Sequence, residues 1–311
     1  MNDVTDETHF IGKLASSVSP VRVTASVPVN AWAIRNWCHV MGITDPLFTQ
    51  PQVAISRGYD TAVAPPAMLQ LWTVLELQQH EHGVNRSLRK VFTEAGYSAI
   101  VATNYDLSSF RLARVGDLIT THVCLDSISS RKDTPLGTGY FATEFHEWFD
   151  QDGEKLGELK IRCFYFRPLQ GVPSAVRTAL TAQTAVSGEL MINVDTTLIV
   201  AGAIVGNDFE RVHHDRDLAR EQGLPDIIMN IATSAAMAFR YSAVCEPRGL
   251  LTQLSLRLGV PCCPGDVLHL LGQRTEHPVS SERVYTLVGK NNLGEHLKGS
   301  MVIQVAPETQ R

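Results

Sequence analysis

The sequence predicts an α+β protein made of two copies of one helix-plus-sheet unit. Two stretches rich in strand signals, 97–168 and 250–305, each follow a helix that is apolar nearly all round. Short turn motifs also recur in the same order in both halves. A chain of 311 residues is long enough for two such units, each with its own core. Two unrelated α+β domains are the alternative explanation.

The first half begins with a turn and a short strand, predicted at Ser19-Pro20-Val21. A helix follows over 29–41, because its apolar residues recur at helical spacing and Asn30 can cap its first turn. The segment 42–46 ends that helix. Residues 67–80 are apolar on nearly every side, and they predict a buried helix with proline in its first turn.

The second part of this half consists of predicted strands. They are Tyr97 to Tyr105, Leu118 to Ile128, Tyr140 to Phe149 and Leu159 to Phe166. The last two face each other across the hairpin sequence 150–153. The small and polar residues that follow predict a linker at 169–188. The expected domains are therefore 1–168 and 189–311.

The second half repeats the order of the first. An apolar segment at 196–205 precedes a loop and a second all-round apolar helix, 227–241. The predicted strands are Leu250 to Leu258, Val267 to Thr275, Arg283 to Lys290 and His296 to Val305.

Two turn motifs carry the repeat most clearly. Arg114-Val115-Gly116-Asp117 corresponds to Cys263-Pro264-Gly265-Asp266, and Gln151-Asp152-Gly153-Glu154 corresponds to Asn292-Leu293-Gly294-Glu295. Their common order and spacing favour a duplication.

Composition excludes several classes of protein. A formal net charge of −5 without a Lys/Arg cluster argues against nucleic-acid binding. No apolar run reaches the roughly 18 residues that a membrane-spanning helix needs. The polar start predicts no secretory signal, and the six cysteines lack CxxC or metal-type spacing, so we expect a reduced, cytoplasmic setting. Neither a P-loop nor GxGxxG is present, and we expect no cofactor.

The loop at 205–215 carries the chemistry. It places Asp208 five residues before His213, and a carboxylate beside an imidazole can move protons near neutral pH. Aligning the two halves puts Ile43 and Phe48 at these positions in the first copy, which predicts one site per chain. Taken singly, Asp208 would be a capping loop carboxylate and His213 a structural histidine. Their spacing and the helix that follows favour an acid/base pair.

These residues resemble the MaoC-like, (R)-specific enoyl-CoA hydratase family. The family motif Gly-Asp-x-Asn-Pro-(aliphatic)-His is matched by Asn207-Asp208-Phe209-Glu210-Arg211-Val212-His213 in its Asp, aliphatic and His positions. The resemblance implies a double hotdog: two antiparallel sheets, each wrapped around a central apolar helix, with a degenerate first copy. Two departures stand out. Glu210-Arg211 replaces Asn-Pro, which removes the orienting amide, and Met229-Asn230 replaces the usual His-Gly.

The resemblance also implies a function. A family member adds or removes water across the C2–C3 bond of an acyl-CoA thioester, with Asp208 and His213 as the acid/base pair. The backbone N–H of Asn230 or Ile231 becomes the oxyanion donor. Glu210 is either a third carboxylate of the site or a solvent-facing substitution. Arg257 either contacts phosphate or pantetheine or lies on an exposed sheet face.

The substrate and partners follow from the same resemblance. Residues 225–231 are similar to actinobacterial dehydratases that act on steroid side-chain acyl-CoA thioesters, which implies a bulky acyl chain. CoA enters only as part of the substrate. A homodimer or higher homo-oligomer is expected. A hotdog acyl-CoA thioesterase and a non-catalytic acyl-CoA-binding subunit are the alternative functions.

Overall fold

A computed structural model describes residues 2–73, 84–168, 188–275 and 281–305 of the chain. Its centre is one 11-stranded sheet in the order β1-β3-β5-β6-β2-β8-β11-β10-β9-β7, with β4 paired to β5. Every pairing along this order is antiparallel. The strands are β1 (Val21–Thr24), β2 (Ala99–Ser109), β3 (Thr120–Ile128), β4 (Lys132–Thr134), β5 (Gly137–Phe149), β6 (Lys155–Pro168), β7 (Glu189–Val194), β8 (Leu250–Leu258), β9 (Asp266–Thr275), β10 (Glu282–Asn291) and β11 (Gly294–Gln304).

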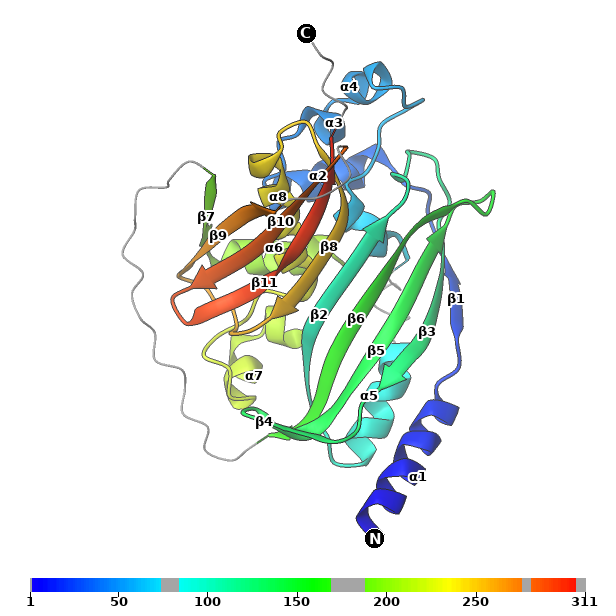
Figure 1. Ribbon diagram of the computed structural model, residues 1–311, viewed down its shortest axis with the longest axis vertical. Coiled ribbons are helices and arrows are strands. Elements are labelled where there is room, and N and C mark those ends of the chain that lie inside the picture. Colours follow the sequence, from blue (N-terminus) through cyan, green and yellow to red (C-terminus); the bar gives the residue numbers. More distant parts are fainter. Residues whose placement is uncertain (1, 74–83, 169–187, 276–280, 306–311) are drawn as a thin grey trace.

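The two copies meet edge to edge where β2 pairs with β8. Tyr105 lies opposite Leu256 in this pairing, and both side chains are buried. The half-sheets therefore continue into one another within a single chain, the first copy in blue to green and the second in green through yellow to red (Figure 1). The predicted strands are confirmed, with shifts of a few residues at their ends.

Helices accompany each half-sheet. In the first copy they are α1 (Asn2–Ser17), α2 (Ala31–Met41), α3 (Pro46–Thr49), α4 (Pro51–Ser56), the 3-10 helix η1 (Pro66–Thr73) and α5 (Val84–Glu94). In the second copy they are α6 (Thr196–Val205), the 3-10 helix η3 (Arg211–His213), α7 (Arg216–Glu221) and α8 (Ile231–Cys245). Among the residues that the structure describes, no helix combines the length and the apolar character needed to cross a membrane.

The repeated turns have the same construction in both copies. Asp117 Oδ2 accepts the backbone N–H of Arg114 at 2.8 Å, and Asp266 Oδ2 accepts that of Cys263, also at 2.8 Å. The acidic side chain in each motif thus fixes the turn just before a long strand. The correspondence noted in the sequence is a structural one.

The central helix of the second copy is α8, which is buried along most of its length. It begins at Ile231, four residues after the predicted start at Ile227, because the Asn230 side chain caps it by accepting the N–H of Thr233 at 2.7 Å. Its buried residues include several alanines, which allow close approach to the sheet. This helix occupies the inner face of its half-sheet.

The first copy covers its half-sheet differently. The described part of the helix predicted at 67–80 is the 3-10 helix η1, and 74–80 lie outside the described residues. Two helices that the sequence did not predict, α1 and α5, cover one end of the sheet. On α5, Val84, Leu88 and Phe92 recur every four residues and are buried, and the Phe92 ring stacks on Tyr165 at 4.3 Å.

A stretch of this inner face lies between the two covered ends. Tyr140 of β5 belongs to the core cluster under α1 and α5. At the other end, Trp148 donates its Nε1–H to Thr73 Oγ1 of η1 at 2.8 Å. Glu144 and His146 lie between these residues on the same face of β5 and line a cavity.

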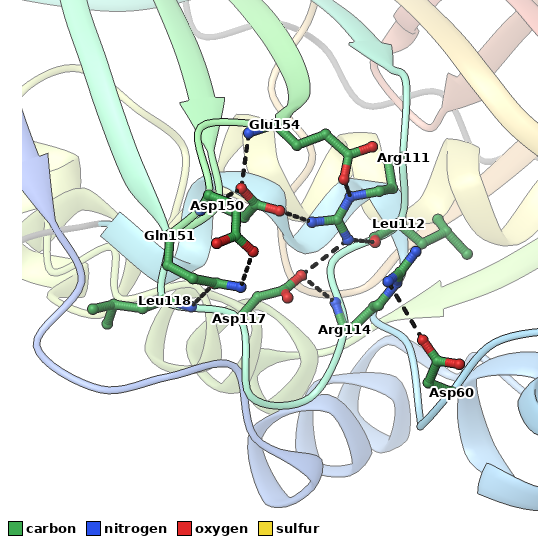
Figure 2. A network of polar contacts seen from close by, with 10 residues as sticks. Asp60, Arg111, Leu112, Arg114, Asp117, Leu118, Asp150, Gln151 and Glu154 are labelled. Atoms are coloured by element: carbon green, nitrogen blue, oxygen red, sulfur yellow. Dashed lines mark hydrogen bonds and ion pairs between the residues drawn. The ribbon is translucent and has the colours of Figure 1, made fainter.

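A buried ionic network ties the first copy together where β3 begins and β5 turns into β6 (Figure 2). Arg111 donates to Asp117 Oδ2 at 3.1 Å and to Asp150 Oδ2 at 2.5 Å. Asp150 also accepts the backbone N–H groups of Asp152 and Glu154. Burial opposes ionisation of Asp150, but these hydrogen bonds outweigh it and hold the pKa of the carboxyl below its usual value.

Candidate active site

Asp208 is held in place by the end of α6. The helix ends at Gly206, and Asn207 follows in the left-handed region with φ of 52°, a conformation that asparagine tolerates better than most residues. The backbone N–H of Asp208 then donates to the carbonyl of Ala203 at 2.9 Å. Asp208 is thus attached to a rigid helix end and lines the cavity.

His213 lies in η3 and is buried, with 8% of its surface exposed. Its Nδ1 is 2.8 Å from the carbonyl oxygen of Ile228, which can only accept, so Nδ1 carries a proton. In the neutral ring Nε2 then presents a lone pair, and it stands 3.5 Å from Asp208 Oδ2. A separation this long is not a direct hydrogen bond. A water molecule beside both atoms can donate one hydrogen to each.

Asn230 supplies an amide to this pair. Its Nδ2 donates to Asp208 Oδ2 at 2.9 Å, while its Oδ1 accepts the N–H of Thr233. The helix cap needs the amide oxygen, so the amide N–H₂ must face the carboxylate. The expectation that this site lacks an orienting amide is therefore wrong. The amide comes from the cap of α8, 22 residues further along the chain, where the family motif has it inside the loop.

The first turn of α8 faces the same space. Residues Ile231 and Ala232 line the cavity, and their N–H groups precede the first one capped by Asn230. Such N–H groups lie at the positive end of the helix dipole. Of the two predicted oxyanion donors, Ile231 lines the cavity together with Ala232, while Asn230 is buried and its side chain contacts Asp208.

The cavity has a volume of about 1270 Å³ and both copies line it. The second copy contributes the loop 206–211 and the start of α8, and the first copy contributes α5 and the inner faces of β1, β3, β5 and β6. The acid/base loop thus opens into the groove of the other copy.

Glu210 connects the loop to the first copy. Its carboxylate pairs with Arg89 of α5, 121 residues away, and its backbone N–H donates to Asp208 Oδ1 at 3.2 Å. The side chain is 50% exposed and lines the cavity. Sequence reasoning left Glu210 undecided and missed Arg89, because nothing in the local pattern links the two segments.

The remaining predicted residues lie elsewhere. Arg257 is exposed on β8, opposite Asn104 of β2 and Lys298 of β11, and it does not line the cavity. The structure therefore places it on the exposed sheet face, the second of its two expected positions. Ile43 and Phe48, which replace the acid/base pair in the first copy, are both buried in the core.

Comparisons with known proteins show which family and fold the chain is similar to. Residues 21–159 match a family described as "FAS1-like, dehydratase domain region". The chain is 35% identical over 146 residues to a probable enoyl-CoA hydratase alpha subunit of Thermomonospora curvata, covering 45% of this chain and 46% of that protein. It is 30% identical to the 3-oxo-4,17-pregnadiene-20-carboxyl-CoA hydratase alpha subunit of Mycobacterium tuberculosis, covering 57% of each. The chain thus spans about half the length of these relatives.

The beta subunit of the same M. tuberculosis hydratase is matched almost completely. The identity is 36% over 129 residues, which cover 40% of this chain and 98% of the beta subunit. Among solved structures, a MaoC-like dehydratase covers 95% of this chain and 100% of its own at a TM-score of 0.72 and 17% identity. A double-hotdog protein of M. tuberculosis covers 92% and 96% at a TM-score of 0.63 and 11% identity. The fold is a double hotdog, and the chain belongs to the MaoC-like dehydratase family.

Proposed function

We propose that the protein is an enoyl-CoA hydratase and 3-hydroxyacyl-CoA dehydratase, with Asp208 and His213 as its acid/base pair. The observation that carries the proposal is the cluster at the start of α8. Asp208 Oδ2 lies 3.5 Å from His213 Nε2 and accepts the amide of Asn230, and helix N–H groups line the same cavity. The cluster supplies a proton acceptor, a group that orients it and donors for a developing negative charge.

The proposed hydration proceeds in two stages. A water held between Asp208 and His213 gives up a proton to the pair while its oxygen bonds to C3. The electrons of the C2–C3 double bond move toward the thioester oxygen, which takes a hydrogen bond from Ile231 or Ala232 N–H. C2 then receives a proton from the pair, and the thioester carbonyl re-forms. Dehydration is the same sequence in reverse.

The size of the cavity supports a bulky acyl group. The first copy has Ile43 and Phe48 where the acid/base residues would be, so its groove contributes volume and no acid/base pair at the corresponding positions. Two of the relatives are named for a steroid-derived acyl-CoA, and we propose a substrate of that bulk. The chemistry requires no cofactor beyond the CoA of the substrate.

Assembly belongs to the same proposal. Asp208, His213, Asn230 and the cavity walls all come from one chain, so the site needs no residue from another subunit. We propose that the protein forms a homo-oligomer. Light scattering gives the molar mass of the active protein, which is compared for the protein purified alone and for the protein co-expressed with candidate partners. No disulfide bond joins any two of the six cysteines, all of which the structure describes, and this supports a reducing compartment such as the cytoplasm.

Loss of the enoyl-thioester absorbance tests the function. The wild type is expected to remove this absorbance from crotonyl-CoA or from a bulky enoyl-CoA without releasing thiol. Asp208→Asn and His213→Ala are each expected to lower kcat by about 100-fold or more, since each removes half of the pair. His214→Ala, a change at the exposed neighbouring histidine, is the matched control and keeps full activity. Folded wild type that leaves both substrates unchanged contradicts the proposal and favours a binding subunit.

A further inference from the structure

Glu144 is a buried carboxylate in the groove of the first copy. It lies in the middle of β5, is 6% exposed and lines the same cavity as Asp208. The mechanism above does not use it. Burying an ionised carboxylate costs free energy unless a hydrogen-bond donor or a positive charge pairs with it, so a partner for Glu144 is expected.

One side chain stands beside it. His146, two residues along the strand, places Nε2 at 3.5 Å from Glu144 Oε2. The imidazole ring is stacked on Trp148, with ring centroids 5.6 Å apart and an angle of 17° between the planes. His146 Nε2 is buried and has no hydrogen-bond partner among the described residues. The ring is therefore fixed with one nitrogen toward the carboxylate, at a distance too long for a full hydrogen bond.

The strand position argues against a second catalytic centre. Glu144 and His146 lie within the ladder that β5 forms with β3 and β6, where backbone N–H groups are engaged in strand pairing. Among the described residues, no contact is found that joins Glu144 or His146 to the first turn of a helix, whereas Asn230 at the start of α8 donates directly to Asp208. The pair is suited to binding.

The residues that line the cavity around Glu144 indicate the chemical class of the ligand. Val21, Val23, Val123 and Ile161 line the cavity from neighbouring strands and provide an apolar surface. Arg86, Arg89 and Lys90 of α5 line the same cavity and offset the charges of its carboxylates, so the lining has no excess negative charge to favour a cationic ligand. A carboxylate is an acceptor, so its partner must be a neutral donor on an apolar body.

We propose that Glu144, held by His146, binds a hydroxyl group carried by the distal part of the acyl chain. This inference rests on the proposed function, because it assigns the far end of that same substrate. The hydroxyl donates to the Glu144 carboxylate, and the hydrocarbon part packs on the valine and isoleucine walls. The site thus selects acyl chains that carry an alcohol in an otherwise apolar, bulky group.

Three matched substrates test the assignment. They are trans-2-enoyl-CoA thioesters ending in a cyclohexyl, a 4-hydroxycyclohexyl or a 4-oxocyclohexyl ring, each at three chain lengths so that the ring reaches different depths. At one length or more, the wild type is expected to favour the hydroxyl over the plain ring by roughly 10- to 100-fold in kcat/KM. Glu144→Leu abolishes that preference and His146→Phe reduces it, while crotonyl-CoA hydration is unchanged in both variants.

The control is Glu147→Gln, on the opposite face of the same strand and outside the cavity lining, which keeps the preference. Glu144→Leu is also expected to raise the thermal midpoint, since it removes a buried carboxylate whose nearest charged neighbour among the described residues, His146, is 3.5 Å away. Equal kcat/KM for all three rings at every length, or a preference for the ketone, overturns the inference while crotonyl-CoA hydration still supports the function. If neither crotonyl-CoA nor any of the ring-bearing thioesters is hydrated, the proposed function fails. Calorimetric binding of the saturated thioesters then tests Glu144 independently, and equal affinities overturn it.

Discussion

Asn230 serves two elements through the two ends of one amide. Its oxygen caps α8 and its nitrogen orients Asp208. The start of the central helix and the acid/base loop are therefore linked by the hydrogen bonds of one side chain. Because the cap fixes which end of the amide faces the carboxylate, the donor is pre-organised for the ionised form of Asp208.

Substitutions at Asn230 separate these two roles. Asn230→Asp keeps a capping oxygen but replaces the donor with a second carboxylate, so kcat/KM is expected to fall about 10- to 100-fold. The second carboxylate also stands beside Asp208 with a like charge, so the pH–rate profile of the variant is expected to differ from that of the wild type. Asn230→Ala loses the cap as well and costs about 1 kcal/mol of stability in addition. An unchanged pH profile in Asn230→Asp would show that the amide does not orient the base.

At the scale of elements, the position of α6 depends on a glycine. An added Cβ at Gly202 would stand 2.6 Å from Thr233 Oγ1 on α8, so the two helices approach more closely than any other residue allows. Since α6 carries Asp208 at its end, this contact sets the distance between the base and the start of α8.

Gly202→Ala is therefore expected to lower both stability and activity. Overpacking of this kind costs about 1–3 kcal/mol, measured by urea unfolding, and the shifted loop lowers kcat. Gly12→Ala is the matched control: that glycine is exposed on α1 with nothing within 4 Å of an added Cβ, so the change is neutral or slightly stabilising. Equal stability of the two variants would contradict the close-packing account.

The elements differ in how far the sequence could predict them. The predicted strands and α8 carry strong periodic or all-round apolar signals, and the structure confirms them, whereas the short strands β4 and β7 were not predicted. The amphipathic helix α5 was missed because only three of its residues are buried among many polar ones. The partners of Asp208 and Glu210, namely Asn230 and Arg89, are joined to them only by the fold. Sequence reasoning predicts an acid/base pair in the loop 205–215 and could not predict the residues that the fold brings beside it.

At the scale of the whole molecule, the two copies contribute different parts of the site. The second copy contributes the acid/base loop and the start of α8, and the first contributes most of the cavity wall and the Arg111 network that stabilises it (Figure 2). Their joint sheet at β2 and β8 fixes the two parts relative to each other.

That network predicts how stability depends on pH. Because the pKa of Asp150 is lowered in the folded state, its contribution is complete above the ordinary carboxyl pKa of about 4 and is lost as the pH falls below it. Asp150→Asn is expected to cost about 3 kcal/mol at pH 7, and the difference from wild type shrinks toward pH 3. Asp60→Asn, which alters an exposed partner of Arg114, leaves the midpoint unchanged. If the difference in unfolding free energy between wild type and Asp150→Asn were the same at all pH values, the ionic network could not be its source.

The most direct test of the central claim is to follow ¹⁸O from labelled water during turnover of an enoyl-CoA. A hydratase that uses Asp208 and His213 is predicted to place one ¹⁸O in the C3 hydroxyl of an intact thioester, and Asp208→Asn to place none above background. A thioesterase would place ¹⁸O in the carboxylate of a released acid and liberate CoA. Label in the carboxylate, or no label in any product of the folded wild type, would contradict the account.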